Sequence, residues 1–149
     1  MAKRTAKATT KRAPKKAPMT RSEVMRAVKS KNTRPELLVM ACLKDEKIKF
    51  STHAKLPGQP DIVLSKRKIA IRVMGCFWHG HSCKNGNRVP RSNIPYWTAK
   101  IKRNVMRDRE NLRDLKKLGW QVINIWECGL RKVNWKEKLI ETIMRLTQS

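Results

Sequence analysis

Four residues that bind metals well constrain this chain more than any other feature of its sequence. Cys76, His81 and Cys83 share the short segment 76–83, and Cys128 follows much later. A tetrahedral zinc ion, which takes Cys thiolates and His imidazole, would join the segment to the chain around Cys128. The fold must therefore bring these two stretches together.

The segment has one histidine more than a closed zinc site needs. His79 and His81 are both candidate ligands, and four ligands complete a structural site. We assign the three cysteines and His81 to a structural zinc. His79 is assigned to chemistry, because it directly follows Trp78 in a loop suited to meet nucleic acid. The alternative, with His79 as the zinc ligand in place of His81, stays open.

The chain is strongly basic, with a formal net charge of +25 over 149 residues. Positions 1–20 contain seven basic residues and no acid, so 25 − 7 = +18 remains on the rest. Because the rest of the chain is itself basic, we expect a polyanionic partner and salt-sensitive binding. A ribosome-associated RNA-binding role or a merely solubilising charge is the alternative.

The sequence also indicates a compartment. No apolar run reaches membrane length, and the N-terminus lacks the apolar segment of a secretory signal. We therefore expect a cytoplasmic protein without a membrane partner. In a reducing compartment, four cysteines indicate metal binding or burial rather than disulfides.

Composition and spacing divide the chain into a disordered basic arm, residues 1–19, and one domain, residues 20–149. The expected helices are 20–28, 35–46, 95–119 and one from 135 onward, and the expected strands are 48–50, 61–64, 69–73 and 120–126. From residue 35 the order is α–β–β–β–α–β–α, which indicates an α/β fold with a mixed sheet flanked by helices. We expect the second helix to bury Leu38, Ala41 and Cys42, and the last strand to be buried on both faces.

A hairpin places an acid beside the metal-binding segment. With a four-residue turn, Leu64 faces Ile69 and Asp61 faces Arg72, so Asp61, Arg72 and Met74 share one face. A carboxylate at the start of a strand can bind a hard cation such as Mg²⁺. An aspartate that only caps the preceding turn is the alternative.

The long helix carries a second carboxylate, Asp108, on its apolar stripe. The apolar residues of this stripe are Trp97, Ile101, Val105, Leu112 and Leu115. An ionised carboxylate that faces a core needs a partner. His79 is one candidate, and a salt bridge with an arginine is the other.

Three aromatic residues lie close to these candidates. Phe77 and Trp78 belong to the metal-binding segment, and Trp97 is near the start of the long helix. On a basic protein such residues suit wedges that unstack a base step, and ordinary core packing is the alternative.

Four motifs together resemble the very short patch repair (Vsr) endonucleases. They are Pro57-Gly58-Gln59-Pro60-Asp61, Gly75-Cys76-Phe77-Trp78-His79, Asn104-Val105-x-Arg107-Asp108 and Trp126-Glu127-Cys128. The resemblance runs from about Thr20 to Leu130. It implies a restriction-endonuclease-like fold with a structural zinc. It also implies an enzyme that nicks one DNA strand 5′ of the thymine in a T·G mismatch, where 5-methylcytosine has deaminated.

The resemblance implies roles for particular residues. Asp61 corresponds to the Mg²⁺ carboxylate, with the backbone carbonyl of Val73 as a second ligand. His79 resembles the catalytic histidine and Asp108 its partner, while Glu36 matches an acid from the N-terminal helix. The three cysteines and His81 match the zinc set. The residues that the resemblance places on DNA are Phe77, Trp78, Trp97 and Met25, and Arg72 is a candidate phosphate contact from its place in the hairpin.

Met74 departs from the family pattern, which usually has His or Asp at this position. A thioether does not transfer a proton and is a poor ligand for Mg²⁺. The alternative function is therefore a catalytically impaired protein that binds mismatched DNA. In either case we expect a monomer at the nucleoid, recruited by other repair proteins.

Overall fold

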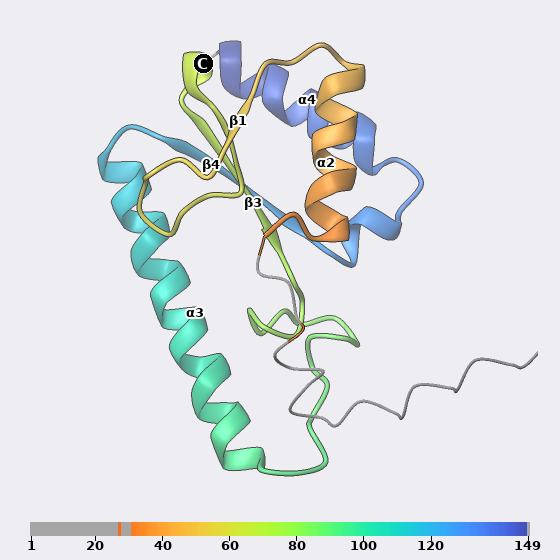
Figure 1. Cartoon of the computed structure of the whole chain (residues 1–149), viewed down its shortest axis with the longest axis vertical. Helices are drawn as coiled ribbons and strands as arrows, with labels where there is room; N and C mark the ends of the chain where they lie inside the picture. Colours follow the sequence, from red (N-terminus) through yellow and green to blue (C-terminus); the bar gives the residue numbers. More distant parts are fainter. Residues whose placement is uncertain (1–26, 28–30, 149) are drawn as a thin grey trace, which may run out of the picture. The chain divides into compact units, whose positions relative to one another are not determined.

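A four-stranded mixed sheet organises the chain (Figure 1). The computed structural model describes residue 27 and residues 31–148, and residues 31–149 group as one unit. The elements are α2 Arg34–Asp45, β1 Ser51–Thr52, β2 Ile62–Leu64, η1 Ser65–Arg67, β3 Ile69–Met74, α3 Ile94–Lys117, β4 Gln121–Trp126, η2 Gly129–Arg131 and α4 Trp135–Gln148. Their α–β–β–β–α–β–α order confirms the α/β prediction.

The sheet order is β1-β2-β3-β4. The pairs β1–β2 and β2–β3 are antiparallel, whereas β3 and β4 run parallel. Leu64 pairs with Ile69, which confirms the predicted hairpin register. One pair beyond Ile62–Ile71, the same register brings Asp61 opposite Arg72.

Helices cover both faces of the sheet. On one face, alternate residues of β2 and β3 pack against Val39 and Leu43 of α2 and Ile143 of α4. On the other face, Val63 and Ala70 pack against Leu115 of α3. Figure 1 accordingly shows α2 and α4 side by side, with α3 along the opposite side of the strands.

Two predictions about the first elements are wrong. The first strand is Ser51–Thr52 instead of 48–50, because Ile48 and Phe50 pack against the core without joining the ladder. In α2, Leu38 is 43% exposed and Ala41 is also exposed. The face of this helix that packs against the sheet differs from the predicted one. Its buried residues are Glu36, Val39, Met40, Cys42 and Leu43.

The prediction that the last strand is buried on both faces is also wrong. β4 is an edge strand that pairs with β3, and no other strand in the described part of the chain pairs with it. Its residues are half-buried, and Asn124 is exposed. Its apolar run is explained by packing between helices on the two faces.

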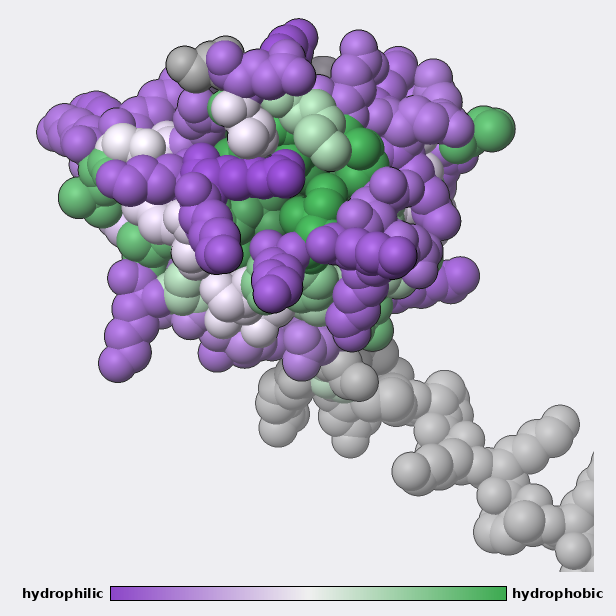
Figure 2. Space-filling view, turned by 90° about the horizontal axis from the view of Figure 1, so that it is seen from above, coloured by the Kyte–Doolittle hydropathy of each residue, from purple (hydrophilic) through white to green (hydrophobic). Residues whose placement is uncertain are grey.

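The visible surface is mostly hydrophilic (Figure 2), as expected for a chain in which 32% of the residues are charged. Figure 2, which views the end of the molecule where α4 ends, shows mostly hydrophilic residues around a smaller apolar area. No helix in the described residues is long and apolar enough to span a membrane. The predicted arm 1–19 and Met25 lie outside the described residues, and so does the helix predicted at 20–28 apart from Ala27.

Candidate functional site

The ends of β3 and β4 bring the four predicted zinc ligands together. Met74 pairs with Trp126 at the ends of these parallel strands, and the Glu127 N–H extends the ladder to the Met74 carbonyl at 3.0 Å. The chain beyond each strand therefore starts from the same edge of the sheet. The ligand atoms of four residues all lie within 4.8 Å of one another, namely those of Cys76, His81, Cys83 and Cys128.

The sulfur atoms in this cluster lie beside backbone N–H groups and His81. The backbone N–H of Cys128 donates to Cys76 Sγ at 3.4 Å, and that of Gly86 donates to Cys83 Sγ at 3.4 Å. The His81 hydrogen bond chiefly lowers the pKa of Cys83 to about 6, whereas burial raises the pKa of Cys76 to about 11. Three thiols and one imidazole can hold a metal ion, and this donor set fits four-coordinate zinc.

His79 is not part of that cluster, and it contacts Asp108 of α3 instead. His79 Nδ1 lies 2.5 Å from Asp108 Oδ2, and Arg72 Nη2 lies 2.5 Å from Asp108 Oδ1. The side chains of Asp108 and Arg72 are 16% and 8% exposed. The two partners considered for Asp108, a histidine and an arginine, are thus both present.

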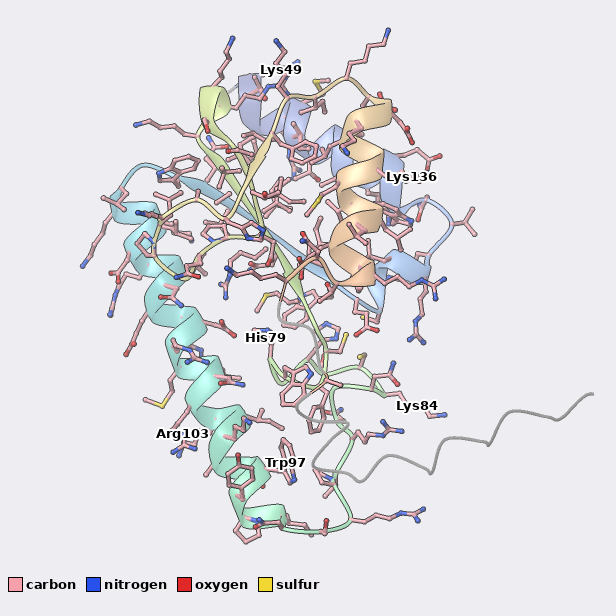
Figure 3. All side chains as sticks on the ribbon, viewed as in Figure 1. Lys49, His79, Lys84, Trp97, Arg103 and Lys136 are labelled. Atoms are coloured by element: carbon pink, nitrogen blue, oxygen red, sulfur yellow. The ribbon has the colours of Figure 1, made fainter. Side chains whose placement is uncertain are left out.

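Close packing against α3 holds the loop that carries His79. Asn104 Nδ2 donates to the Trp78 carbonyl at 3.0 Å. Gly80 has a φ of +61°, and a Cβ there would lie 3.1 Å from Val105 and 3.3 Å from Ile101. A larger residue would strain the backbone and push the loop away from the helix. Figure 3 shows His79 between the end of the sheet and α3.

Asp61 lies at the end of the hairpin. Its Oδ2 accepts a hydrogen bond of 2.7 Å from the Val73 backbone N–H. Burial raises the pKa of Asp61, and the nearby charge of Glu36 adds to the rise, while the Val73 N–H opposes it. Glu36 is itself 4% exposed and accepts a hydrogen bond from Thr33 Oγ1. A cation near Asp61 would stabilise its ionised form against burial and the charge of Glu36, so the site fits a hard divalent ion.

The turn before Asp61 also depends on α3. Gly58 has a φ of +70°, and a Cβ at this position would lie 2.8 Å from the Asn111 side chain. The glycine of the Pro57–Asp61 motif therefore allows a close approach to the helix. α3 thus contacts both the turn that leads to Asp61 and the loop that carries His79.

The three predicted aromatic residues form one half-buried group. The ring centroids of Phe77 and Trp78 are 5.2 Å apart, those of Phe77 and Trp97 5.8 Å, and those of Trp78 and Trp97 5.9 Å. Trp97 reaches the group from the N-terminal part of α3 (Figure 3).

A lysine that the sequence analysis missed belongs to this group. Lys100 Nζ lies 5.3 Å from the Trp97 centroid, 5.5 Å from that of Trp78 and 5.6 Å from that of Tyr96. These are cation–π distances. The spacing of Tyr96, Trp97 and Lys100 on one helix was the available signal, because residues three and four apart are neighbours.

Met74 lines a cavity of about 350 Å³ together with Arg72, His79 and Asp108. The residue is 4% exposed. Arg72 and Met74 therefore share a face, as predicted. The Asp61 carboxylate, whose hydrogen bond is to the Val73 backbone, is not among the groups that line this cavity.

Known proteins identify the family. A family model described as DNA mismatch endonuclease Vsr matches residues 14–85. The Escherichia coli DNA mismatch endonuclease Vsr is 39% identical over 123 residues, which cover 82% of this chain and 76% of that protein. The chain belongs to the Vsr family of DNA mismatch endonucleases.

Other relatives of this Vsr-family chain are nicking enzymes by name. The type II nicking enzyme V.XorIIP of Xanthomonas oryzae pv. oryzae is 40% identical over 86% of this chain and 94% of its own length. V.NmeAIP of Neisseria meningitidis is 44% identical over 80% of this chain and 86% of its own length. Family membership confirms the predicted endodeoxyribonuclease class.

A solved structure confirms the predicted fold class. The catalytic domain of the homing endonuclease I-Bth0305I matches with a TM-score of 0.52 and 23% identity, over 79% of this chain and all of that domain. The mixed sheet flanked by helices is thus restriction-endonuclease-like. The Vsr-family chain presents its Cys₃His cluster, its His–Asp pair and Asp61 on this scaffold.

Proposed function

We propose that this Vsr-family protein is a Mg²⁺-dependent endonuclease that nicks one strand of duplex DNA 5′ of the thymine in a T·G mismatch. The observation that carries the proposal is the Arg72–Asp108–His79 chain of contacts, since Val73, the residue after Arg72, donates its backbone N–H to Asp61. A proton-transfer group and a cation-binding carboxylate therefore belong to one region of the protein. This combination suits hydrolysis of a phosphodiester.

Asp61 and the Val73 carbonyl would hold the Mg²⁺ ion, with Glu36 close to Asp61. When bound, the ion supplies Lewis-acid polarisation of the scissile phosphate. Val73 donates its N–H to one carboxylate oxygen of Asp61, which fixes the carboxylate and leaves its other oxygen for a cation. The negative charge of Glu36 repels that of Asp61. A bound cation would offset this repulsion, so the pair favours cation binding.

His79 would act as the general acid or base. Its Nδ1 contacts Asp108, so Nε2 is the nitrogen that can exchange a proton with DNA or water. Asp108 would orient the ring through this contact. The side chain is 28% exposed, which gives a substrate access to it.

The aromatic group of Phe77, Trp78 and Trp97 would contact the mismatch, with Met25 entering from the other groove. Stacking and pairing are weaker at a mismatch, so insertion and local distortion cost less there than in perfect duplex. The Cys₃His cluster would hold a structural zinc that fixes the base of this loop. For an enzyme that acts on mismatched DNA, we expect a place at the nucleoid of the cytoplasm, with other repair proteins as partners.

A catalytically impaired mismatch-binding protein is the second candidate, and Met74 is the observation that favours it. Met74 lies in the cavity beside His79 and offers only a weak acceptor. If the family's usual His or Asp at this position supplies a proton or a metal ligand, this chain lacks that group.

Strand-resolved cleavage of labelled duplexes tests both candidates. With Mg²⁺, wild type is expected to nick the T strand of a T·G duplex at one position and to leave the matched T·A duplex intact. Asp61→Ala should abolish the nick. Tight mismatch binding without a nick, together with cleavage gained by Met74→His, would support the second candidate.

A further inference from the structure

Arg72 is a buried cation to which the proposed mechanism gives no task. It lies on β3, yet both ends of its guanidinium reach Asp108 on α3. Nη2 is 2.5 Å from Asp108 Oδ1, and Nη1 donates to the Asp108 backbone carbonyl at 3.4 Å. Arg72 thus holds both the carboxylate and the main chain of this one helical residue.

The two oxygens of Asp108 have separate partners. Oδ1 contacts Arg72 and Oδ2 contacts His79. An ionised carboxylate only accepts hydrogen bonds, so the His79 nitrogen that faces it must be the donor. Rotation of the carboxylate would disturb both contacts together, and anything that fixes Oδ1 therefore also fixes the hydrogen bond to His79.

The pairing also balances charge in a largely buried place. An unpaired carboxylate that is 16% exposed would be costly, and the guanidinium beside it neutralises it. Met74, next to Arg72 on the same face, gives His79 no strong polar partner. The orientation of the His79 ring therefore depends heavily on Asp108, and that of Asp108 on Arg72.

We infer that Arg72 is a positioning residue, which holds the Asp108 carboxylate in the orientation that fixes the His79 ring. The inference rests on the proposed function for its kinetic consequences. It differs from the hairpin-based expectation of a phosphate contact, because Arg72 is only 8% exposed and its guanidinium is bound to Asp108.

Kinetics with matched variants separate the two roles. Arg72→Met removes the guanidinium, and Arg113→Met removes an exposed arginine of α3 that does not line the cavity. We expect Arg72→Met to lower the single-turnover rate at saturating T·G duplex by about 10- to 100-fold, with the Kd for DNA nearly unchanged. Arg72→Lys should recover part of the rate lost in Arg72→Met, and Arg113→Met should keep the wild-type rate.

An NMR readout does not require cleavage. The His79 Nδ1–H proton, bound to Asp108, should give a downfield signal that disappears in His79→Gln. We expect Arg72→Met to broaden or remove this signal and Arg113→Met to keep it. If Arg72→Met does not fold, the comparison is made with Arg72→Lys, which should weaken the signal.

Two results would overturn the inference. One is an unchanged His79 signal in the folded Arg72 variants. The other is a raised Kd for DNA with an unchanged rate at saturation, which would make Arg72 a phosphate contact. If wild type does not nick a T·G duplex, the proposed function fails, and the NMR comparison still decides the role of Arg72.

Discussion

His79 has two ring nitrogens with different surroundings. Nδ1 faces the Asp108 carboxylate, and Nε2 has no protein partner in the described residues. The ring is therefore held from one side and open to a substrate on the other. General acid–base catalysis needs both properties, because the ring must be oriented and must also reach the reacting atoms.

His79→Ala should lower the rate of T·G nicking by about 10²- to 10⁴-fold, the usual contribution of a general acid or base. Mismatch affinity should stay close to wild type, because the aromatic group is unchanged. Single-turnover cleavage and a DNA-binding titration measure the two quantities. His53→Asn, at an exposed position, is the matched control and should cleave normally. Equal rates for wild type and His79→Ala would exclude this role.

The raised pKa of Asp61 has a consequence for stability. The folded-state pKa lies above the ordinary aspartate value of 3.8, so the folded protein retains this proton to higher pH than the unfolded chain does. The stability contributed by Asp61 therefore falls as pH rises from that value through the folded pKa, and stays lower above it. Without Mg²⁺, Asp61→Asn should be more stable than wild type at neutral pH, and the difference should vanish in acid.

Thermal unfolding of the zinc-loaded proteins from acid to neutral pH measures the difference in stability between wild type and Asp61→Asn. Adding Mg²⁺ should raise the Tm of wild type and leave that of Asp61→Asn unchanged, because only the wild type has the cation-binding carboxylate. Equal Mg²⁺ responses in both proteins would place the ion elsewhere.

At the scale of elements, the parallel ends of β3 and β4 explain the metal cluster. Cys76 and Cys128 follow strands that end side by side, so a ladder of backbone hydrogen bonds brings together residues far apart in the sequence. The cluster in turn fixes the base of the loop that carries Phe77, Trp78 and His79. Metal binding and the placement of His79 should therefore be linked.

Cys128→Ser should reduce zinc content from about one ion per chain, the expectation for a four-ligand site, towards zero. It should also lower the Tm and the nicking rate, because structural zinc contributes directly to folding. Native mass spectrometry and thermal unfolding measure these effects. Cys42→Ala is the matched control, since Cys42 is buried in α2 away from the cluster and its loss should leave zinc bound. Full zinc occupancy in Cys128→Ser would remove this residue from the site.

Several of these elements could be predicted from local chemistry. The spacing of the three ligands in segment 76–83, the hairpin register and the Asp108 stripe on α3 each depend on residues close in the sequence. The position of β1, the exposed side of α2 and the half-buried edge strand β4 depend on sheet order and on which helix packs where. The two hydrogen bonds from Arg72 to Asp108, and the position of Lys100 near three aromatic rings, also depend on how α3 packs against the sheet and the loop.

At the scale of the whole molecule, charge is spread over the fold. Lys49 and Lys84 project from connecting segments, and Arg103 and Lys136 project from α3 and α4 (Figure 3). With +18 of the +25 charge outside positions 1–20, we expect the domain itself to bind the DNA backbone. The strength of this binding should follow counterion release.

A variant that lacks residues 1–19 should keep steep salt dependence of DNA binding. The logarithm of affinity falls by about 0.9 per neutralised phosphate for each tenfold rise in salt, and most of the basic residues remain in the variant. Binding titrations at several salt concentrations give the slope. A nearly flat slope would mean that the N-terminal arm supplies the backbone contacts.

The central claim is that a cation held by Asp61 and the His79 imidazole act on one phosphodiester. The most direct measurement is the anomalous signal of Mn²⁺, used in place of Mg²⁺, in crystals of the protein with a T·G duplex. We predict a Mn²⁺ peak between the Asp61 carboxylate and the scissile phosphate, with His79 facing the same phosphate. A complex in which Asp61 binds no ion, or in which His79 and the ion contact different parts of the DNA, would contradict the account.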